Sequence, residues 1–268
     1  MLVALPMLWA VGYAATYSVG GIGYFSQGWT FEHWKSAIAG YGVMQSLALS
    51  LGIAAIVTTI VTCVSLGVVI CFPEWRQRAS FYCLAGMMLA TPVSVTAFMV
   101  VIFLGSGGLF ARLLFHMRLI ESPSDFPELI YDRYSIGIVI AQSISFLPLM
   151  LFYLSQLWQT IHADRLLFLS QTLGCSLRQA KWRVVLPTML LRSRSVILLV
   201  FLFSLGSYEV PLLLGRQSPQ MFSVLVQRYA NRFDLLQKPQ AFVLATVYFA
   251  ISMGLLITYL RWRHRHEV

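Results

Sequence analysis

The chain has 268 residues, of which 58% are hydrophobic and 11% are charged, and its mean hydropathy is +0.74. Soluble domains carry charge on roughly a quarter of their residues, so this composition excludes an ordinary soluble protein and predicts a polytopic membrane protein. The formal charge of +9 does not indicate a nucleic-acid partner, because the basic residues lie in short segments that flank apolar runs.

Six apolar stretches divide the sequence, and a helix needs about 20 such residues to cross a bilayer. We therefore expect an all-α polytopic transmembrane bundle of about six spans, in a single domain over residues 1–268. No Lys or Arg precedes the first stretch, so we predict a retained span rather than a cleavable signal, and the sequence leaves open that a tail precedes Met1. The expected spans cover residues 2–19, 43–72, 81–104, 136–157, 196–214 and 241–260.

Polar residues occur inside two of the early spans. The second span contains Thr58, Thr59, Thr62 and Ser65, which can bond to carbonyls of their own helix, so their polarity does not by itself indicate a pathway. The third span carries Thr91-Pro92 at its middle. An intramembrane proline frees a carbonyl and kinks the helix, and both a hinge in a transport pathway and an inert packing kink fit this position.

One long charged segment separates the fourth and fifth spans, and residues 165–194 read RLLFLSQTLGCSLRQAKWRVVLPTMLLRSR. Gly174 interrupts two stretches with helical patterning, and glycine permits the backbone that a sharp turn between helices needs. Leu186-Pro187 stands where the apolar run resumes. The pattern predicts an amphipathic hairpin on the membrane surface, made of a helix, a glycine break, a second helix and a proline stop.

The spacing in this hairpin resembles the cytoplasmic coupling loop of the membrane subunits of ATP-binding-cassette importers, whose signature is Glu-Ala-Ala, three residues, Gly and, further on, Leu-Pro. Gly174 and Leu186-Pro187 match the signature. Phe168-Leu169-Ser170 stands in place of Glu-Ala-Ala, which leaves docking to shape and hydrophobic contact. Common family usage also agrees with Leu173, Ser176 and the run Gln179-Ala180-x-Trp182-Arg183-Val184.

The fifth expected span contains a second motif, and residues 204–215 read SLGSYEVPLLLG. This pattern resembles the branch of the same family that includes polyamine, thiamine, ferric-iron and sulfate permeases. The two motifs together imply the type I importer permease fold, with a coupling loop at about residues 160–190. The ATPase-coupling residues that the resemblance implies are Leu173, Gly174, Ser176, Leu177, Ala180, Arg183 and Pro187.

A substrate pathway is expected near the second motif. Glu209 is the only acid in or at the edge of an expected span, which makes it the default candidate for a pathway role. It lies near the external end, where water or Arg216 could satisfy it, so substrate contact and a solvated carboxylate both stay open. The expected pathway residues are Ser204, Ser207, Tyr208, Glu209, Thr91 and Pro92.

The distribution of charge predicts the orientation. Residues 72–80, 157–195 and 261–268 together hold 11 of the 19 Lys and Arg residues and three of the ten acids. The excess of basic residues predicts that both termini and the hairpin are cytoplasmic. The resemblance implies a multi-pass protein of a bacterial-type cytoplasmic (inner) membrane.

The sequence offers no catalytic residues. It has no Walker glycine loop, no paired acids and no nucleophile with an adjacent base, so any ATP hydrolysis is expected on a separate chain. Neither CxxC spacing nor clustered histidines appear, so we expect no disulfide, metal or cofactor.

The resemblance implies a permease subunit that works with two ATPase subunits, a second permease subunit and an extracytoplasmic substrate-binding protein, all assembled in a lipid bilayer. The second permease subunit could be a copy of this chain or a homologue. A catalytically silent membrane scaffold that keeps the permease fold but has lost ATP coupling is the alternative, because the Glu-Ala-Ala triplet is missing.

Overall fold

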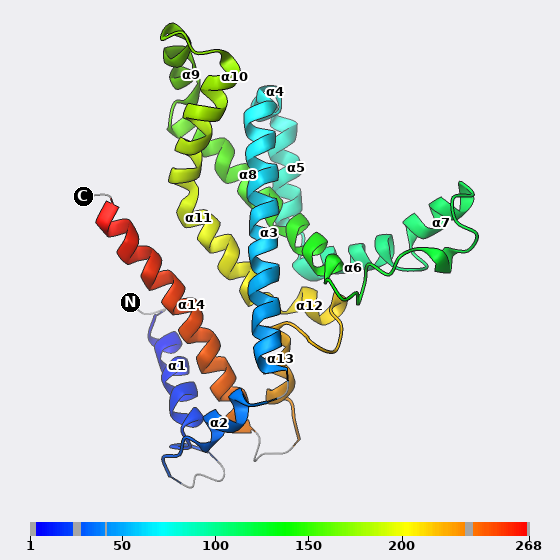
Figure 1. Ribbon diagram of the computed structural model, residues 1–268, viewed down its shortest axis with the longest axis vertical. Helices are drawn as coiled ribbons and strands as arrows, with labels where there is room; N and C mark the ends of the chain where they lie inside the picture. The colour runs from blue at the N-terminus through cyan, green and yellow to red at the C-terminus, as the bar shows by residue number, and fades with distance from the viewer. Residues whose placement is uncertain (1–3, 24–27, 41, 234–237, 267–268) are drawn as a thin grey trace. The chain divides into compact units, whose positions relative to one another are not determined.

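The computed structural model describes residues 4–23, 28–40, 42–233 and 238–266, and every regular element in these ranges is a helix (Figure 1). The all-α class expected from the sequence is confirmed, and the long apolar helices show a membrane-embedded protein. The sequence predicts six spans, whereas five helices among the described residues are long and apolar enough to cross a membrane. These five are Val43–Cys71, Val93–His116, Ile136–Thr160, Leu177–Gly206 and Lys238–Arg263.

The chain divides into two compact units. One unit is formed by residues 1–50 and 218–268, and the other by residues 51–217. Helix α3 (Val43–Cys71) is continuous through Ser50 and Leu51, the residues at which the chain passes from the first unit to the second.

The first unit is built around the long helix α14 (Lys238–His266). Helix α1 (Ala4–Ser18) packs along it in the opposite direction, and the ring centroids of Tyr17 and Phe242 lie 4.3 Å apart (Figure 1). Helix α1 has 15 residues, so it falls short of a full span. Helices α2 (Glu32–Ile38) and α13 (Phe222–Ala230) also pack against α14.

A buried serine fixes the start of α13 within this unit. The Phe222 N–H is one of the helix N-terminal donors that lack a partner within the helix, and it donates to Ser50 Oγ at 2.7 Å. Ser50 Oγ donates in turn to the Ser46 carbonyl at 2.9 Å. The Phe222 ring stacks on Tyr248 with 5.3 Å between centroids. The hydrogen bond from Phe222 to Ser50 therefore connects the first turns of α3 to the core of the unit.

Replacing Ser50 with alanine is expected to destabilise the first unit. The substitution leaves the buried Phe222 N–H without an acceptor, which costs about 1–3 kcal/mol. Thermal unfolding of the purified protein in detergent measures the loss. Ser252→Ala is the matched control, because the Ser252 hydroxyl bonds the Tyr248 carbonyl of its own helix. An equal fall in both variants would contradict this account.

The second unit is arranged around α8 (Ile136–Thr160), which packs against α5, α6, α11 and α12. Its helices run between two ends: α4 and the hairpin of α9 and α10 lie at one end, and α7 and α12 lie toward the other (Figure 1). The remaining elements are α4 (Pro73–Gln77), α5 (Ala79–Ala90), α6 (Val93–Leu104), α7 (Leu109–His116), the 3-10 turn Pro123–Asp125, α9 (Ala163–Thr172), α10 (Leu177–Ala180), the π-helical segment Lys181–Val185, α11 (Leu186–Gly206) and α12 (Glu209–Leu214).

The third expected span is broken rather than kinked. Thr91 is extended, with φ −74° and ψ 128°, as the residue before a proline commonly is. Helix α5 therefore ends at Ala90, and α6 starts at Val93. The Thr91 hydroxyl donates to the Met88 carbonyl at 2.6 Å and so satisfies one acceptor that the break exposes.

The predicted proline stop is wrong. Residues Leu177–Gly206 form one continuous helical stretch of 30 residues, and Pro187 lies in the first turn of α11. The turn before it, Lys181–Val185, is π-helical. A π turn shifts the backbone bonding by one residue, so a proline, which lacks an N–H, can follow without ending the helix. The fifth helix consequently starts ahead of the predicted Val196 and ends at Gly206, before the predicted Leu214.

Candidate functional site: the charged hairpin and the break between α11 and α12

The turn of the hairpin depends on Gly174, which has φ +89°. The Cys175 N–H donates to the Ser170 carbonyl at 3.0 Å, and the Gly174 N–H donates to the Gln171 carbonyl at 2.9 Å. These two bonds form a Schellman motif, which ends α9 and requires a left-handed residue at the glycine position. No other atom lies within 4 Å of a Cβ placed on Gly174, so its backbone conformation alone favours glycine there.

A capping box starts the second arm of the hairpin. The Gln179 N–H donates to Ser176 Oγ at 3.3 Å, and the Ser176 N–H donates to Gln179 Oε1 at 3.1 Å. The box satisfies two donors at the N-terminus of α10. Ser176, which the sequence places among the coupling residues, therefore shapes the hairpin through its backbone and hydroxyl.

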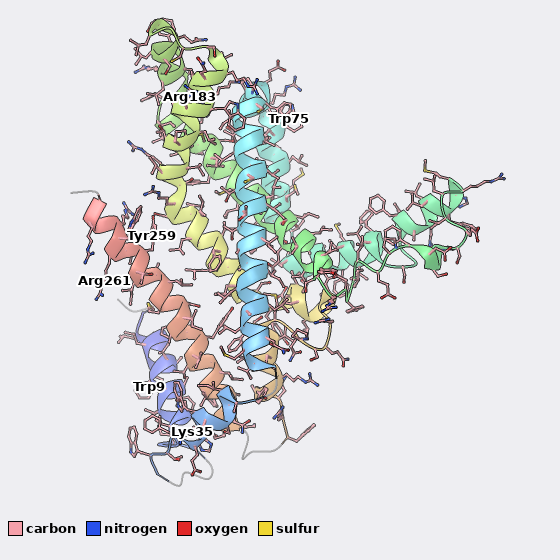
Figure 2. All side chains as sticks on the ribbon, in the orientation of Figure 1. Trp9, Lys35, Trp75, Arg183, Tyr259 and Arg261 are labelled. Atoms are coloured by element: carbon pink, nitrogen blue, oxygen red, sulfur yellow. The ribbon has the colours of Figure 1, made fainter. Side chains whose placement is uncertain are left out.

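The tip of the hairpin exposes large apolar side chains. Leu173 is 85% exposed, Leu177 is 49% exposed and Trp182 is 52% exposed. Apolar groups gathered in this way on a surface mark an interaction site. Arg178 and Arg183 are exposed on the same segment, and Figure 2 labels Arg183 on this part of the second unit.

Two of the predicted coupling residues are less accessible than a docking role requires. Ala180 is fully buried, so its methyl group packs inside the hairpin and offers no surface to a partner. Pro187 is partly buried in the first turn of α11. The exposed members of the predicted set are Leu173, Gly174, Ser176, Leu177 and Arg183.

The hairpin is joined tightly to a membrane helix at each end. A turn at Ile161 and His162, the latter with φ +50°, connects it to α8, and Trp158 Nε1 donates to Asp164 Oδ1 across this turn at 3.2 Å. On the other side the helical backbone continues directly from α10 into α11. A displacement of the hairpin would therefore move α8 and α11 with it.

The break between α11 and α12 lies beside a buried polar pair. The Ser204 hydroxyl donates to Gln142 Oε1 of α8 at 2.5 Å, and both residues are at most 1% exposed. Helix α11 then ends at Gly206, Ser207 is extended with ψ 131°, and α12 begins at Glu209. The pair thus holds α8 against α11 directly before the point where the fifth helix is interrupted.

The structure gathers four of the six predicted pathway residues at this break. Ser204 is buried, Ser207 and Tyr208 are partly buried, and the Glu209 side chain is exposed. The other two, Thr91 and Pro92, are exposed at the separate break between α5 and α6. Helix α12 packs on both α6 and α8, so the elements that follow the two breaks are in contact.

Several buried polar groups of the second unit have no hydrogen-bond partner, and three of them belong to the polar residues expected in the second span. The hydroxyl of Thr59 does bond the Ala55 carbonyl of its own helix, as expected, but the same expectation is wrong for three other hydroxyls of α3. Each such group costs about 1–3 kcal/mol when it is buried without a hydrogen-bond partner. The unpartnered atoms are Thr58 Oγ1, Thr62 Oγ1, Ser65 Oγ, Tyr82 OH, Gln142 Nε2, Ser143 Oγ and Ser155 Oγ.

Metal ligands are not gathered anywhere in the described ranges, where no group of three or more His, Cys, Asp or Glu side chains could hold an ion. Cys63, Cys71, Cys83 and Cys175 are free and exposed.

A double-mutant cycle is expected to show that Gln142 and Ser204 stabilise the helix pair together. Ser204→Ala leaves both polar atoms of Gln142 unpaired, and Gln142→Leu leaves the Ser204 hydroxyl unpaired, so each single change costs about 1–3 kcal/mol. The double change removes both groups and is expected to cost less than the sum of the single changes. Unfolding in detergent measures all four proteins, and strict additivity would contradict a direct interaction.

The fold and the site together define a polytopic α-helical membrane protein with a surface hairpin connected to α8 by a short turn and to α11 by continuous helical backbone. Searches against models of known protein families and against curated proteins find no match to this chain.

Proposed function

We propose that this chain is the permease subunit of an ATP-driven importer of the binding-protein-dependent type. The observation that carries the proposal is the hairpin, in which an exposed apolar tip at Leu173 and Leu177 is joined at both ends to long membrane helices. A surface of this kind fits a groove on a partner, and the continuous backbone into α11 supplies a mechanical connection. The missing ATP site would belong to two partner ATPase subunits.

The proposed mechanism is alternating access driven from the cytoplasmic side. Closure of the ATPase dimer would move the hairpin as a lever and thereby shift α8 and α11. Packed helices transmit such motion because they switch between discrete arrangements. The Gln142–Ser204 pair and the break at Ser207 lie where α8 and α11 meet, so the motion would reach the proposed pathway there.

The proposed pathway is lined by neutral polar groups, because the buried polar atoms described in the second unit belong to hydroxyls and to the Gln142 amide. Glu209 is exposed at the start of α12 and would meet solutes at the mouth of the path. The proposal places the protein in a bacterial-type inner membrane with both termini and the hairpin cytoplasmic. A second permease subunit and an extracytoplasmic binding protein would complete the assembly.

The position of α4 beside the end that carries the hairpin supports this orientation of the second unit. Both lie at the same end of that unit, as the excess of basic residues in 72–80 and 157–195 predicts (Figure 1). The mixed-charge loop around the 3-10 turn Pro123–Asp125 lies at the other end, where the binding protein would dock.

A scaffold that keeps the permease fold without ATP coupling is the second candidate. The observation that favours it is the exposure of Phe168 and Leu169, at 66% and 56%, where the family signature has Glu and Ala. An apolar surface without the acid could bind another membrane protein instead of an ATPase.

Co-purification distinguishes the two candidates. The tagged chain is extracted in mild detergent with a non-hydrolysable ATP analogue, and the accompanying proteins are identified by mass spectrometry. A permease is expected to bring an ATP-binding subunit that hydrolyses ATP once the analogue is removed. Recovery of other membrane proteins alone, from a preparation in which a known transporter keeps its ATPase, would contradict the permease proposal and favour the scaffold.

A further inference from the structure

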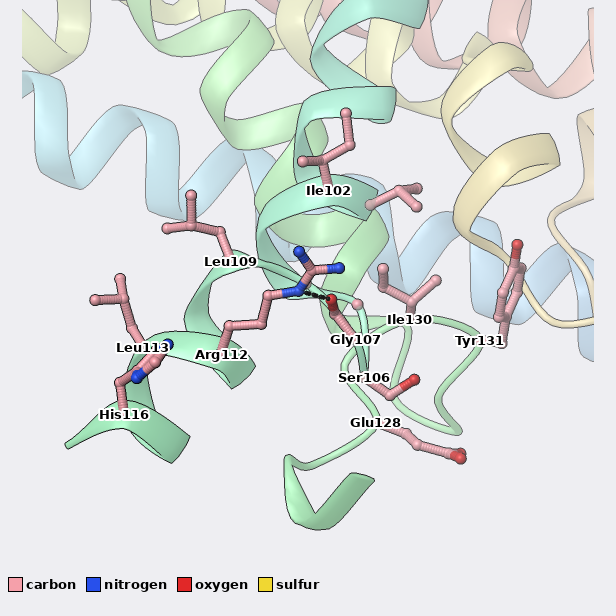
Figure 3. A pocket seen from close by; sticks show the side chains of 13 residues that line it. Ile102, Ser106, Gly107, Leu109, Arg112, Leu113, His116, Glu128, Ile130 and Tyr131 are labelled. Carbon is pink, nitrogen blue, oxygen red and sulfur yellow. Dashed lines mark hydrogen bonds between the residues drawn. The ribbon is translucent and has the colours of Figure 1, made fainter. Parts of the chain in front are cut away.

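A hollow of about 820 Å³ lies where α6 ends and α7 begins, and the loop that leads to α8 closes its other side (Figure 3). It lies within the second unit, and neither the hairpin nor the Gln142–Ser204 pair contributes to its lining. Its apolar lining includes Ile102, Leu113 and Ile130, and its polar groups come from Ser106, Arg112, His116, Glu128 and Tyr131.

The hollow lies beside helices of bilayer-spanning length. Gly105 follows directly after α6, and the far wall precedes α8, which starts at Ile136. The stretch Val93–His116, which is long and apolar enough to cross a bilayer, continues through one wall of the hollow, and α8 belongs to another such stretch. Lipid surrounding these helices can therefore reach the hollow.

The walls of the hollow are fixed by backbone contacts. The Tyr131 N–H donates to the Leu214 carbonyl of α12 at 3.1 Å. On the other side the turn is compact at Gly108, where a Cβ would lie 2.6 Å from the Ile102 carbonyl oxygen and 2.9 Å from that of Gly105. A preformed shape of this kind favours a bound ligand, because little ordering is needed on binding.

Arg112 is held in place with its charge available to a ligand. Its Nε donates to the Gly107 carbonyl at 3.1 Å, which leaves the two terminal nitrogens of the guanidinium facing the hollow (Figure 3). Among the described residues, neither Arg112 nor Glu128 takes part in an ion pair. The hollow thus contains an unpaired cation and an unpaired anion beside an apolar floor.

We infer that this hollow binds a zwitterionic phospholipid, with the phosphodiester at Arg112 and a primary ammonium group at Glu128. A guanidinium matches two phosphate oxygens, and a carboxylate accepts hydrogen bonds from an ammonium group. The apolar floor continues onto the exposed face of α6, where Phe98 is 53% exposed and Met99 is 51% exposed, so acyl chains can follow this helix. A soluble phosphodiester would not use that surface.

Lipid binding to the purified full chain tests the inference, with phosphatidylethanolamine and phosphatidylglycerol as the two probes and native mass spectrometry as the readout. We expect the native chain to prefer phosphatidylethanolamine. Arg112→Gln should weaken binding of both lipids by at least about tenfold, because the charge-assisted hydrogen bonds from the guanidinium to the phosphate are lost. Glu128→Gln should remove the preference and leave phosphatidylglycerol binding unchanged.

Two further variants keep the test clear of folding effects. Arg118→Gln removes an exposed cation from the same loop outside this hollow and should leave lipid binding unchanged. Arg112→Lys keeps the charge without the planar pair of donors and should fall between the native chain and Arg112→Gln. Each variant must also have the same thermal unfolding midpoint in detergent as the native chain. If Arg112→Gln is destabilised, the lipid binding of Arg112→Lys is used in its place to test the inference.

Three outcomes would overturn the inference. One is unchanged lipid binding in the Arg112 variants. Another is equally tight binding of glycerophosphoethanolamine, which has the headgroup without acyl chains and would indicate a soluble ligand. The third is a cross-link from position 112 to a second copy of the chain, which would show that protein covers the hollow. None of these results depends on whether an ATPase binds the hairpin.

Discussion

Leu173→Asp is expected to abolish ATPase association while leaving the permease folded. The Leu173 side chain is 85% exposed at the tip of the hairpin, so it contributes little to the packing of its own chain. Burial of this leucine in a groove of the partner would make it a central contact, and truncating such contacts costs at least about 2 kcal/mol, or about 30-fold in affinity. Co-purification yield and ATP-stimulated transport in vesicles measure the loss.

Leu119→Asp is the matched control for this variant. Leu119 is 66% exposed and follows α7 in the chain, outside the hairpin, so the same charge is added to a similarly exposed leucine. Substitutions at such surface positions change stability by about 0.5 kcal/mol or less. An equal loss of ATPase in both variants would indicate a general effect of the added acid and would remove the argument for docking at the tip.

Gly174→Val is expected to lose ATPase association for a different reason, because it disrupts the turn that presents Leu173. Gly174 has φ +89°, and a residue with a Cβ pays about 1–2 kcal/mol in the left-handed region, with β-branched residues the least tolerant. The chain would lower this strain by abandoning the Schellman bonds from Gly174 and Cys175. We expect a loss of about tenfold or more in ATPase recovery, on the scale of a displaced central contact.

Gly174→Asn distinguishes the effect of backbone conformation from the effect of adding a side chain. Asparagine adopts the left-handed region far more readily than valine, so this variant should retain most of the ATPase. Gly254→Val controls for the added side chain, because Gly254 lies inside α14 with nothing within 4 Å of a placed Cβ. If asparagine and valine at position 174 reduce ATPase recovery equally, the turn conformation is not the cause.

The sequence was sufficient for the features that depend on local patterning. Apolar runs predict the long helices, although six spans were expected and five helices of that length are described. The turn at Gly174 follows from the backbone preference of glycine, and the interruption at Thr91-Pro92 follows from that of proline, although the sequence indicated a kink and the structure has a break. The exposed hairpin tip likewise follows from the charged composition of residues 165–194. These features need no knowledge of which helices touch.

The features that the sequence did not predict depend on geometry or tertiary contact. The helix continues past Pro187 because a π-helical turn precedes it, and residue composition does not reveal that turn. Ala180 is a small residue on a charged segment, and only the packing of the hairpin shows that it is buried. The polar pair joins Gln142 to Ser204 across 62 residues of sequence, although a glutamine inside an apolar run is a signal that could have pointed to it.

The central claim is that the hairpin tip docks on an ATPase, and site-specific photocross-linking tests it most directly. A benzophenone amino acid is placed at position 173, the protein is irradiated in native membranes, and the cross-linked partner is identified by mass spectrometry. We expect a product that contains a subunit with a Walker ATP-binding loop, and no such product from the same probe at position 119. Cross-links from position 173 to lipid alone, or to proteins without an ATP site, would contradict the account.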